Sequence, residues 1–397
     1  MLLKESLRIA GRALQGRSVD ATHEMRAFPA ANGTGTKGGA VFEDSHGRAH
    51  SIDEHLRYGL KDAWRVYSPL SFLAELHERK LLDPEGLELL KKLRGRRTIS
   101  APLDEVRNAV TPYKEEFGHL LTDPALSSLG KRVLRPTPAE IEKKIAQSIE
   151  GHNRTLNVLG ELGHTITPKG SSVMEIGYIS GGESIVGFER MGFQAAGLEY
   201  FYDGTLDGVM RYQEVQKVTG TSVRFEMGDI TKKTLFQDEE FDLIFTAQVL
   251  EHIVNLPDAF REMHRILKPG GVMVHVYDPY FHPRGGHSFG ILDFPWGHLR
   301  LDSSDFERYL KELRPYEAEH ALPWCQTSLN RKNTIQVVQG ALVDAGFLIR
   351  SWKQFRWDGA MGIHLTTDVI RECLERNPQV SLDDLMTSGV RVIAEKA

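Results

Sequence analysis

The sequence has 397 residues, of which 41% are hydrophobic and 26% charged, and its formal net charge is −5. These are ordinary values for a soluble globular protein large enough to bury a sizeable core. The acidic balance offers no basic stripe for a nucleic acid, and no run approaches the ~20 apolar residues that span a membrane.

The first 165 residues are predicted to form a mostly helical region with no strand. Its opening residues lack the apolar stretch of a secretory signal. Residues 28–50, FPAANGTGTKGGAVFEDSHGRAH, are rich in Gly, Ala and Thr without any period, which indicates a flexible or extended segment. From Ser51 onward apolar residues recur at helical spacing, and further helices are predicted at about 84–95, 103–121 and 137–163.

From residue 166 to 397 the pattern changes to short apolar runs that alternate with helical segments. Buried strands alternating with helices favour an α/β fold with a doubly wound, mostly parallel sheet. Two segments without this rhythm are interpreted as insertions, at 279–330 and 354–388. The predicted strands are 173–177, 194–198, 223–227, 241–246, 271–277, 347–353 and 389–394, and the predicted helices are 183–191, 202–218, 256–267 and 334–345.

The first of these strands leads into a glycine-rich turn, in the stretch VMEIGYISGGES. In a doubly wound sheet, ligands bind outside the carboxyl ends of the strands. Gly177 allows a tight turn there, and Gly181 and Gly182 allow a ligand to approach the backbone closely. The next two strands end in Glu199 and Asp229, and an acidic side chain at the end of the second strand can bind ribose hydroxyls.

Further along the chain, FDLIFTAQVLEHI and ILKPGG follow in the same order. This order of motifs resembles the class I S-adenosylmethionine-dependent methyltransferases, in particular their small-molecule branch, over about residues 150–278 and again near the end of the chain. The resemblance implies a Rossmann-like sheet of seven strands whose last strand is antiparallel, with S-adenosylmethionine as cofactor. A dinucleotide pattern would need glycine where Ile179 stands, and it does not include the LEHI or ILKPGG elements.

The resemblance also implies a role for individual residues of the cofactor site. Glu175 would border the amino group at the methionine end, while Gly177 and Gly181 would line the cofactor. Glu199 would bind the ribose diol, Asp229 the adenine amino group, Ile230 would pack on the ring, and Gln248 would stand beside the sulfonium. The chain departs from the family at Ile179, whose β-branched side chain restricts the backbone where a glycine is usual. We expect the turn to retain the cofactor.

The insertion after the fifth strand is rich in histidine and aromatic residues. It contains His282, His287 and His298, and it begins beside the expected cofactor pocket. A histidine can accept a proton from a hydroxyl, phenol or amine near neutral pH. One of the three is therefore the candidate general base, with Asp278 or Asp293 to orient it.

Three other interpretations of these histidines stay open. A histidine pair with a carboxylate could bind a divalent metal, although the spacing matches no regular zinc motif and we assign no metal ligand. The histidines could instead hold an irregular loop by hydrogen bonds, or His252 of LEHI could be the base.

The sequence thus predicts a methyltransferase acting on oxygen or nitrogen of a small molecule of specialised metabolism. The alternatives are a metal-assisted O-methyltransferase and a degenerate fold that serves as a binding or scaffold protein. The N-terminal region and the insertion at 354–388 are expected to cover the pocket or to form a homodimer surface. Because only two cysteines occur, Cys325 and Cys373, we expect a cytoplasmic protein. The acidic charge and the lack of a long apolar run predict no nucleic-acid or membrane partner.

Overall fold

The computed structural model describes the central sheet, its helices and parts of both insertions. The residues described are 41–52, 80–94, 138–177, 182–200, 215–283, 292–313, 333–356 and 365–397, with a few isolated positions between these ranges.

The centre of the molecule is a seven-stranded sheet in the order β5-β4-β3-β6-β7-β9-β8. The five strands from β5 to β7 are mutually parallel, and β9 runs antiparallel to both of its neighbours. The predicted seven-stranded Rossmann-like sheet with an antiparallel last strand is confirmed. The strands are β3 (Ser172–Ile176), β4 (Gln194–Glu199), β5 (Arg224–Met227), β6 (Phe241–Ala247), β7 (Leu267–Tyr277), β8 (Phe347–Arg356) and β9 (Thr387–Lys396).

Helices cover both faces of this sheet, because successive residues of its buried strands point to opposite sides. Val173 packs into a core shared with α8 (Pro138–Glu161) and α9 (Glu183–Met191). Its neighbour Met174 packs into the core shared with α11 (Leu256–Ile266) and α16 (Ile335–Asp344). All four helices were predicted within a few residues. Of the predicted helix at 202–218, only the part from 215 onward lies within the described residues, and it is helical.

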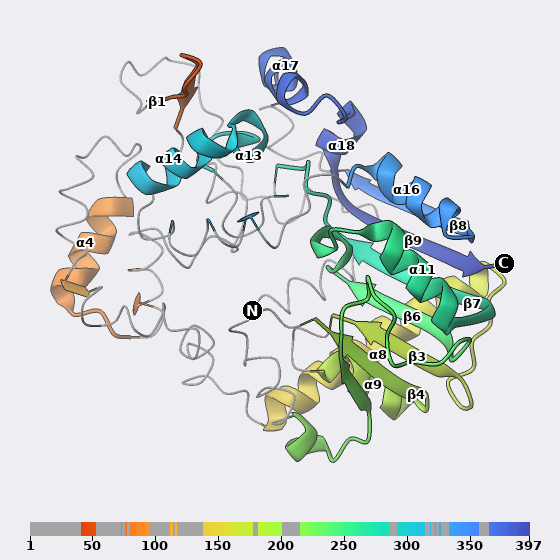
Figure 1. The fold of residues 1–397 in the computed structure, drawn as a ribbon. Helices are drawn as coiled ribbons and strands as arrows, with labels where there is room; N and C mark the ends of the chain where they lie inside the picture. The colour runs from red at the N-terminus through yellow and green to blue at the C-terminus, as the bar shows by residue number, and fades with distance from the viewer. Residues whose placement is uncertain are drawn as a thin grey trace.

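A second apolar core, which we name the cap core, joins three segments that are far apart in the sequence. It combines a hairpin of β1 (Val41–Glu43) and β2 (Ala49–Ser51) with helices from both predicted insertions. Figure 1 shows these elements in the upper part of the view, with the sheet at the lower right. The helices are α13 (Gly297–Arg300) and α14 (Ser303–Leu313) from the first insertion, and α17 (Thr367–Arg376) and α18 (Leu382–Met386) from the second.

The hairpin corrects the expectation that the first 165 residues contain no strand. It also orders residues 41–50, the last part of the segment interpreted as flexible, whereas residues 28–40 lie outside the described range. Each of its strands has three residues and one inward side chain, which is too short for a periodic signal. Phe42 packs edge-on to Tyr309 of α14 with 5.0 Å between ring centroids, so tertiary contact stabilises the hairpin.

The predicted N-terminal helices are confirmed in part. The segment expected at 84–95 is α4 (Pro84–Arg94), and the one at 137–163 is α8. The helix expected at 103–121 lies mostly outside the described residues. Within the part of the chain that the structure describes, none of the helices has the length and apolar character needed to cross a membrane.

Candidate active site

The carboxyl ends of the adjacent parallel strands bring the predicted cofactor residues to one edge of the sheet. Glu175 lies on β3, Glu199 ends β4, and Asp229 follows β5. Gln248 follows β6 and Asp278 follows β7. Because β5, β4, β3, β6 and β7 are neighbours in that order, these five side chains form one row at the edge where ligands of such sheets bind.

Glu175 is a buried carboxyl group at the centre of this row. It is 5% exposed, and its Oε2 atom has no hydrogen-bond partner among the described residues. Burial raises the pKa of Glu175 to about 8, a hydrogen bond with Ser184 opposes the shift, and the charges of Glu199 and Glu183 add to it. A buried carboxyl without a cation of its own fits the α-amino group of an amino-acid ligand, whose positive charge would lower that pKa again.

Gly177 closes β3 with a backbone conformation that favours glycine. Its φ is +78°, and its N–H donates to the Leu198 carbonyl at 2.9 Å. A Cβ atom added at this position would lie 2.3 Å from Cγ2 of Val249, so the chain after β6 passes directly against the turn. Gly182, with φ +86°, is the N-cap residue that precedes α9. Ile179 and the predicted Gly181 fall outside the described residues.

The two acidic residues on the next strands are held by local hydrogen bonds. Oε1 of Glu199 accepts from the Tyr200 N–H at 3.1 Å. Oδ1 of Asp229 accepts from the Thr231 N–H at 2.9 Å and from its hydroxyl at 2.7 Å. Burial raises the pKa of Asp229, but these bonds and nearby Lys232 outweigh it, so the net pKa is lowered and the group is ionised near neutral pH. Ile230 is buried in the main core, which is the core that Met174 shares with α11 and α16.

Gln248 connects the ends of β6 and β7. Its Nε2 atom donates to Oδ2 of Asp278 at 3.0 Å, and its backbone N–H donates to the Val276 carbonyl at 2.7 Å. Its φ is +59°, a left-handed conformation that costs a residue with a Cβ atom roughly 1–2 kcal/mol. Such strained positions cluster at functional sites.

The structure describes two of the three candidate histidines, and both are buried. His298 lies on α13, where its Nε2 atom is 2.9 Å from the Tyr280 carbonyl, and its ring lies edge-on to that of Tyr280. Because a carbonyl only accepts, the proton of the neutral ring is on Nε2. His282 is 2% exposed and sits in a turn in which its carbonyl accepts from the Gly285 N–H at 2.7 Å. His287 lies outside the described residues.

The two carboxylates expected to orient a histidine differ in their partners. Asp293 accepts a hydrogen bond from the Tyr309 hydroxyl at 2.6 Å, with both groups buried in the cap core. Asp278 bonds Gln248 at the edge of the sheet. In the described residues, no three His, Cys, Asp or Glu side chains gather closely enough to hold a metal ion.

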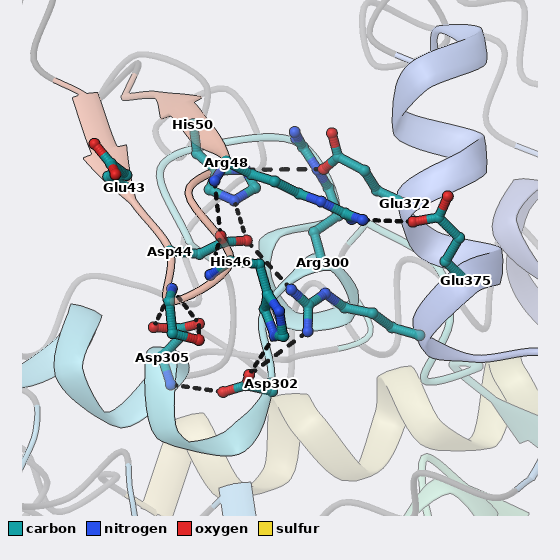
Figure 2. Close-up of polar contacts among 12 residues, drawn as sticks. Glu43, Asp44, His46, Arg48, His50, Arg300, Asp302, Asp305, Glu372 and Glu375 are labelled. Atoms are coloured by element: carbon teal, nitrogen blue, oxygen red, sulfur yellow. Dashed lines mark hydrogen bonds and ion pairs between the residues drawn. The ribbon is translucent and has the colours of Figure 1, made fainter.

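A buried charge network, which we name the clasp, joins the hairpin to both insertions. The clasp consists of Asp44, His50, Arg300, Glu372 and Arg376, and Figure 2 labels the first four of these residues. Oδ2 of Asp44 lies 3.2 Å from Nε2 of His50 and 3.2 Å from Nη2 of Arg376. Nε of Arg300 donates to Glu372 at 2.7 Å. No motif in the sequence indicates this network, because its members come from three distant segments.

The family comparison agrees with this geometry. Residues 181–275, from the glycine turn to β7, match the family model described as a methyltransferase domain. The chain therefore carries a methyltransferase domain over these residues. S-adenosylmethionine is therefore the cofactor of this domain, as the sequence predicted, and the buried Glu175 carboxyl at the edge of its sheet fits the amino group of that cofactor.

Individual relatives of the methyltransferase domain match parts of the chain. A demethylmenaquinone methyltransferase of Leptospira interrogans is 41% identical over 54 residues, which are 14% of this chain and 22% of the relative. An uncharacterised methyltransferase of Mycobacterium sp. (strain KMS) is 31% identical over 139 residues, 34% of this chain and 50% of the relative. The chain thus spans between about a fifth and a half of the length of these curated relatives.

Among solved structures, the chain is similar to geranyl diphosphate C-methyltransferase from Streptomyces coelicolor A3(2), with 16% identity and a TM-score of 0.37. The match covers 64% of this chain and 84% of that one. A methyltransferase from Mesorhizobium loti gives 16% identity and a TM-score of 0.35, over 59% of this chain and 96% of that one.

Proposed function

We propose that this protein transfers the methyl group of S-adenosylmethionine to an oxygen or nitrogen atom of a small molecule. The observation that carries the proposal is the row of Glu175, Glu199, Asp229 and Gln248 along the carboxyl ends of four adjacent parallel strands. A small-molecule substrate is supported by the demethylmenaquinone methyltransferase, whose name specifies such a substrate.

Within this proposal, each residue of the row binds one part of the cofactor. Glu175 accepts from the α-amino group, and Gly177 with Gly181 lets the backbone approach the ligand. Glu199 accepts from the ribose hydroxyls, and Asp229 from the adenine amino group. Ile230 provides apolar surface beside the ring, although its side chain also belongs to the main core. Gln248 stands beside the sulfonium.

The chain's contribution to the chemistry is to orient the acceptor atom and to remove its proton. When bound, S-adenosylmethionine supplies an already activated methyl group, so positioning and proton transfer are what the protein adds. We assign the general base to a histidine of the insertion that begins at residue 279, namely His282, His287 or His298, with Asp278 close to the reacting end. The hydrogen bond of His298 to the Tyr280 carbonyl supports a role for that residue in holding the loop.

The cap core is proposed to cover the substrate side of the pocket. The first insertion leaves the end of β7 beside Asp278, and the clasp connects it to the hairpin and to α17. The region 1–165, apart from α8, which packs on the sheet, would then act as the cap of the catalytic domain 166–397. We propose a cytoplasmic enzyme, because both cysteines are buried free thiols. We also propose that it forms a homodimer and that it binds no nucleic acid, since its net charge is negative.

The test is calorimetric titration of the purified protein with S-adenosylmethionine and S-adenosylhomocysteine, repeated with Ile179→Gly. Micromolar binding by the natural protein supports the proposal. Absence of binding until glycine is restored would instead indicate a fold that has lost its chemistry, and a search for protein partners would follow.

The assignment of the base has its own test. Alanine substitution of His282, His287 or His298 is expected to reduce turnover sharply for the base and to leave cofactor affinity unchanged. Wild-type turnover in all three variants would remove the histidine mechanism. Loss of activity on chelation, restored by a divalent ion, would replace it with metal assistance.

A further inference from the structure

A group of buried polar side chains lies where β6 and β7 end, next to the proposed methyl-transfer site. Glu251 belongs to the short helix η1 (Leu250–His252) and is 3% exposed. Tyr277 ends β7 and is 2% exposed. Asp278 follows it and accepts the hydrogen bond from Gln248 at 3.0 Å.

Two of these groups lack the partners that buried polar atoms normally have. Both carboxylate oxygens of Glu251 and the hydroxyl of Tyr277 are buried without a hydrogen-bond partner among the described residues. A buried, ionised carboxylate without partners is costly, so Glu251 is stable there only when it carries a proton or faces a cation. This feature distinguishes it from the paired carboxylates of the clasp.

The electrostatics of the two carboxyl groups are linked. Burial raises the pKa of Glu251 well above its ordinary value, and the charge of Asp278 raises it further, while the nearby backbone N–H groups of both residues offset part of the effect. Burial and then the charge of Glu251 raise the pKa of Tyr277, which keeps its hydroxyl neutral. Two carboxyl groups whose charges interact in this way titrate as a pair.

The position of the pair is fixed relative to the cofactor turn. Val249, two residues before Glu251, lies against Gly177, where an added Cβ would meet its Cγ2 at 2.3 Å. The side-chain amide of Asn333 donates to the Ile253 carbonyl at 3.1 Å and to the Leu250 carbonyl at 3.5 Å, which holds both ends of the η1 segment. The pair therefore sits on a rigid support beside the glycine turn.

We propose that Glu251 and Asp278 form a proton-holding pair that responds to the positive charge of the cofactor's sulfonium. This inference rests on the proposed function, which places the sulfonium beside Gln248. With S-adenosylhomocysteine, which is neutral at sulfur, the pair keeps its proton and carries a single negative charge. Beside a sulfonium both carboxylates are ionised, and the proton leaves to solvent.

The same change of charge gives the acceptor's proton a destination during methyl transfer. The acceptor atom forms its bond to the methyl carbon, the electron pair of the broken carbon–sulfur bond stays on sulfur, and the acceptor's proton passes to the pair, directly or through the histidine base. The sulfur loses its positive charge as the pair loses one negative charge, so the total charge is unchanged. Product formation thereby favours reprotonation of Glu251.

The other titratable groups near the pair do not produce the same difference between the two ligands. The charges of Glu251 and of Asp384 on α18 both raise the pKa of Tyr277, so its hydroxyl stays neutral with either ligand. Glu175 is separate on β3, where its charged neighbours are Glu199 and Glu183. Glu175 is expected to release a proton to any ligand with an α-amino group, and both ligands have one, so its contribution cancels in a comparison of the two.

The experiment is calorimetric titration of the full-length protein with each ligand in buffers of different ionisation enthalpy, across neutral pH. We expect S-adenosylmethionine to release an additional fraction of a proton, at most one per site. Its affinity relative to S-adenosylhomocysteine should rise with pH, up to tenfold per pH unit while the pair holds its proton, and then level off. In Glu251→Gln, which keeps the shape of the side chain, the extra release and the pH dependence of the affinity ratio should disappear.

Equal proton release by the two ligands in the natural protein overturns the inference and leaves the proposed function intact. Failure of both ligands to bind overturns the proposed function and this inference with it. Because the central comparison uses the natural protein, it does not depend on the folding of a variant, and Asp278→Asn provides a second variant in which the difference should be lost.

Discussion

Replacing Gly177 by alanine should destabilise the protein through two separable effects. The φ of +78° costs an alanine roughly 1–2 kcal/mol. The added Cβ would also lie 2.3 Å from Cγ2 of Val249, and overpacking of this kind typically costs ~1–3 kcal/mol. We therefore expect a decrease of about 2–5 kcal/mol in the free energy of unfolding, measured by urea denaturation, together with weaker S-adenosylmethionine binding by calorimetry.

Gly47 provides a matched control, because its φ is +75° and a Cβ added there would meet no atom within 4 Å. Gly47→Ala should cost only the backbone effect of roughly 1–2 kcal/mol and leave cofactor affinity unchanged. In a Val249→Ala background the cost of Gly177→Ala should fall towards that of Gly47→Ala. If the two glycine substitutions destabilise the natural protein equally, the close approach of the β6 segment to the turn is refuted.

Three further predictions concern the cofactor row, the clasp and a buried histidine. Glu199→Ala or Asp229→Ala should weaken S-adenosylmethionine binding by roughly 1–3 kcal/mol, because a polar partner in the ligand is left unpaired, and calorimetry showing unchanged affinity would contradict the assigned roles. Asp44→Asn should lower the free energy of unfolding by about 1.5–3 kcal/mol, because the contacts to His50 and Arg376 are weakened, while cofactor affinity stays the same. An unchanged free energy of unfolding in urea denaturation would mean that the clasp does not stabilise the protein. Burial lowers the pKa of His152 to about 4, so the folded state binds fewer protons than the unfolded one, and the stability that His152 contributes is complete above about pH 6.5 and is lost as pH falls towards 4. NMR titration should show that the His152 ring stays neutral at pH 5.5, which is about one unit below the ordinary histidine pKa. A measured pKa close to 6.5 would contradict this prediction.

The sequence determined the central sheet closely. Strand β3 was expected at 173–177 and is observed at Ser172–Ile176. The prediction was close because a strand buried on both faces is a continuous apolar run, which the local sequence shows directly. The exception is β7, expected to begin at residue 271. It begins at Leu267, which pairs with Phe241 across a register irregularity, so the proline and glycines that signal a turn are included in the strand.

The sequence also located most of the candidate site. Glu199, Asp229 and Gln248 were found because the carboxyl ends of parallel strands meet at one edge, so knowing where each strand ends is sufficient. It did not single out Glu251 as more than a neighbour of His252, since nothing local indicates that a carboxyl group in LEHI is buried without a partner. It could not assign partners to His298 or Asp293, which depend on Tyr280 and Tyr309 across the folded insertion.

Only the tertiary structure decided how the cap is built. Asp44 and Arg376 are separated by 332 positions in the chain, yet their side chains meet in the clasp. Contacts of this kind leave no period and no motif, because they depend on where two chain segments arrive in space and not on the order of neighbouring residues. The sequence by itself therefore determined the sheet and its cofactor edge, whose signals are local, while packing between distant segments determined what covers them.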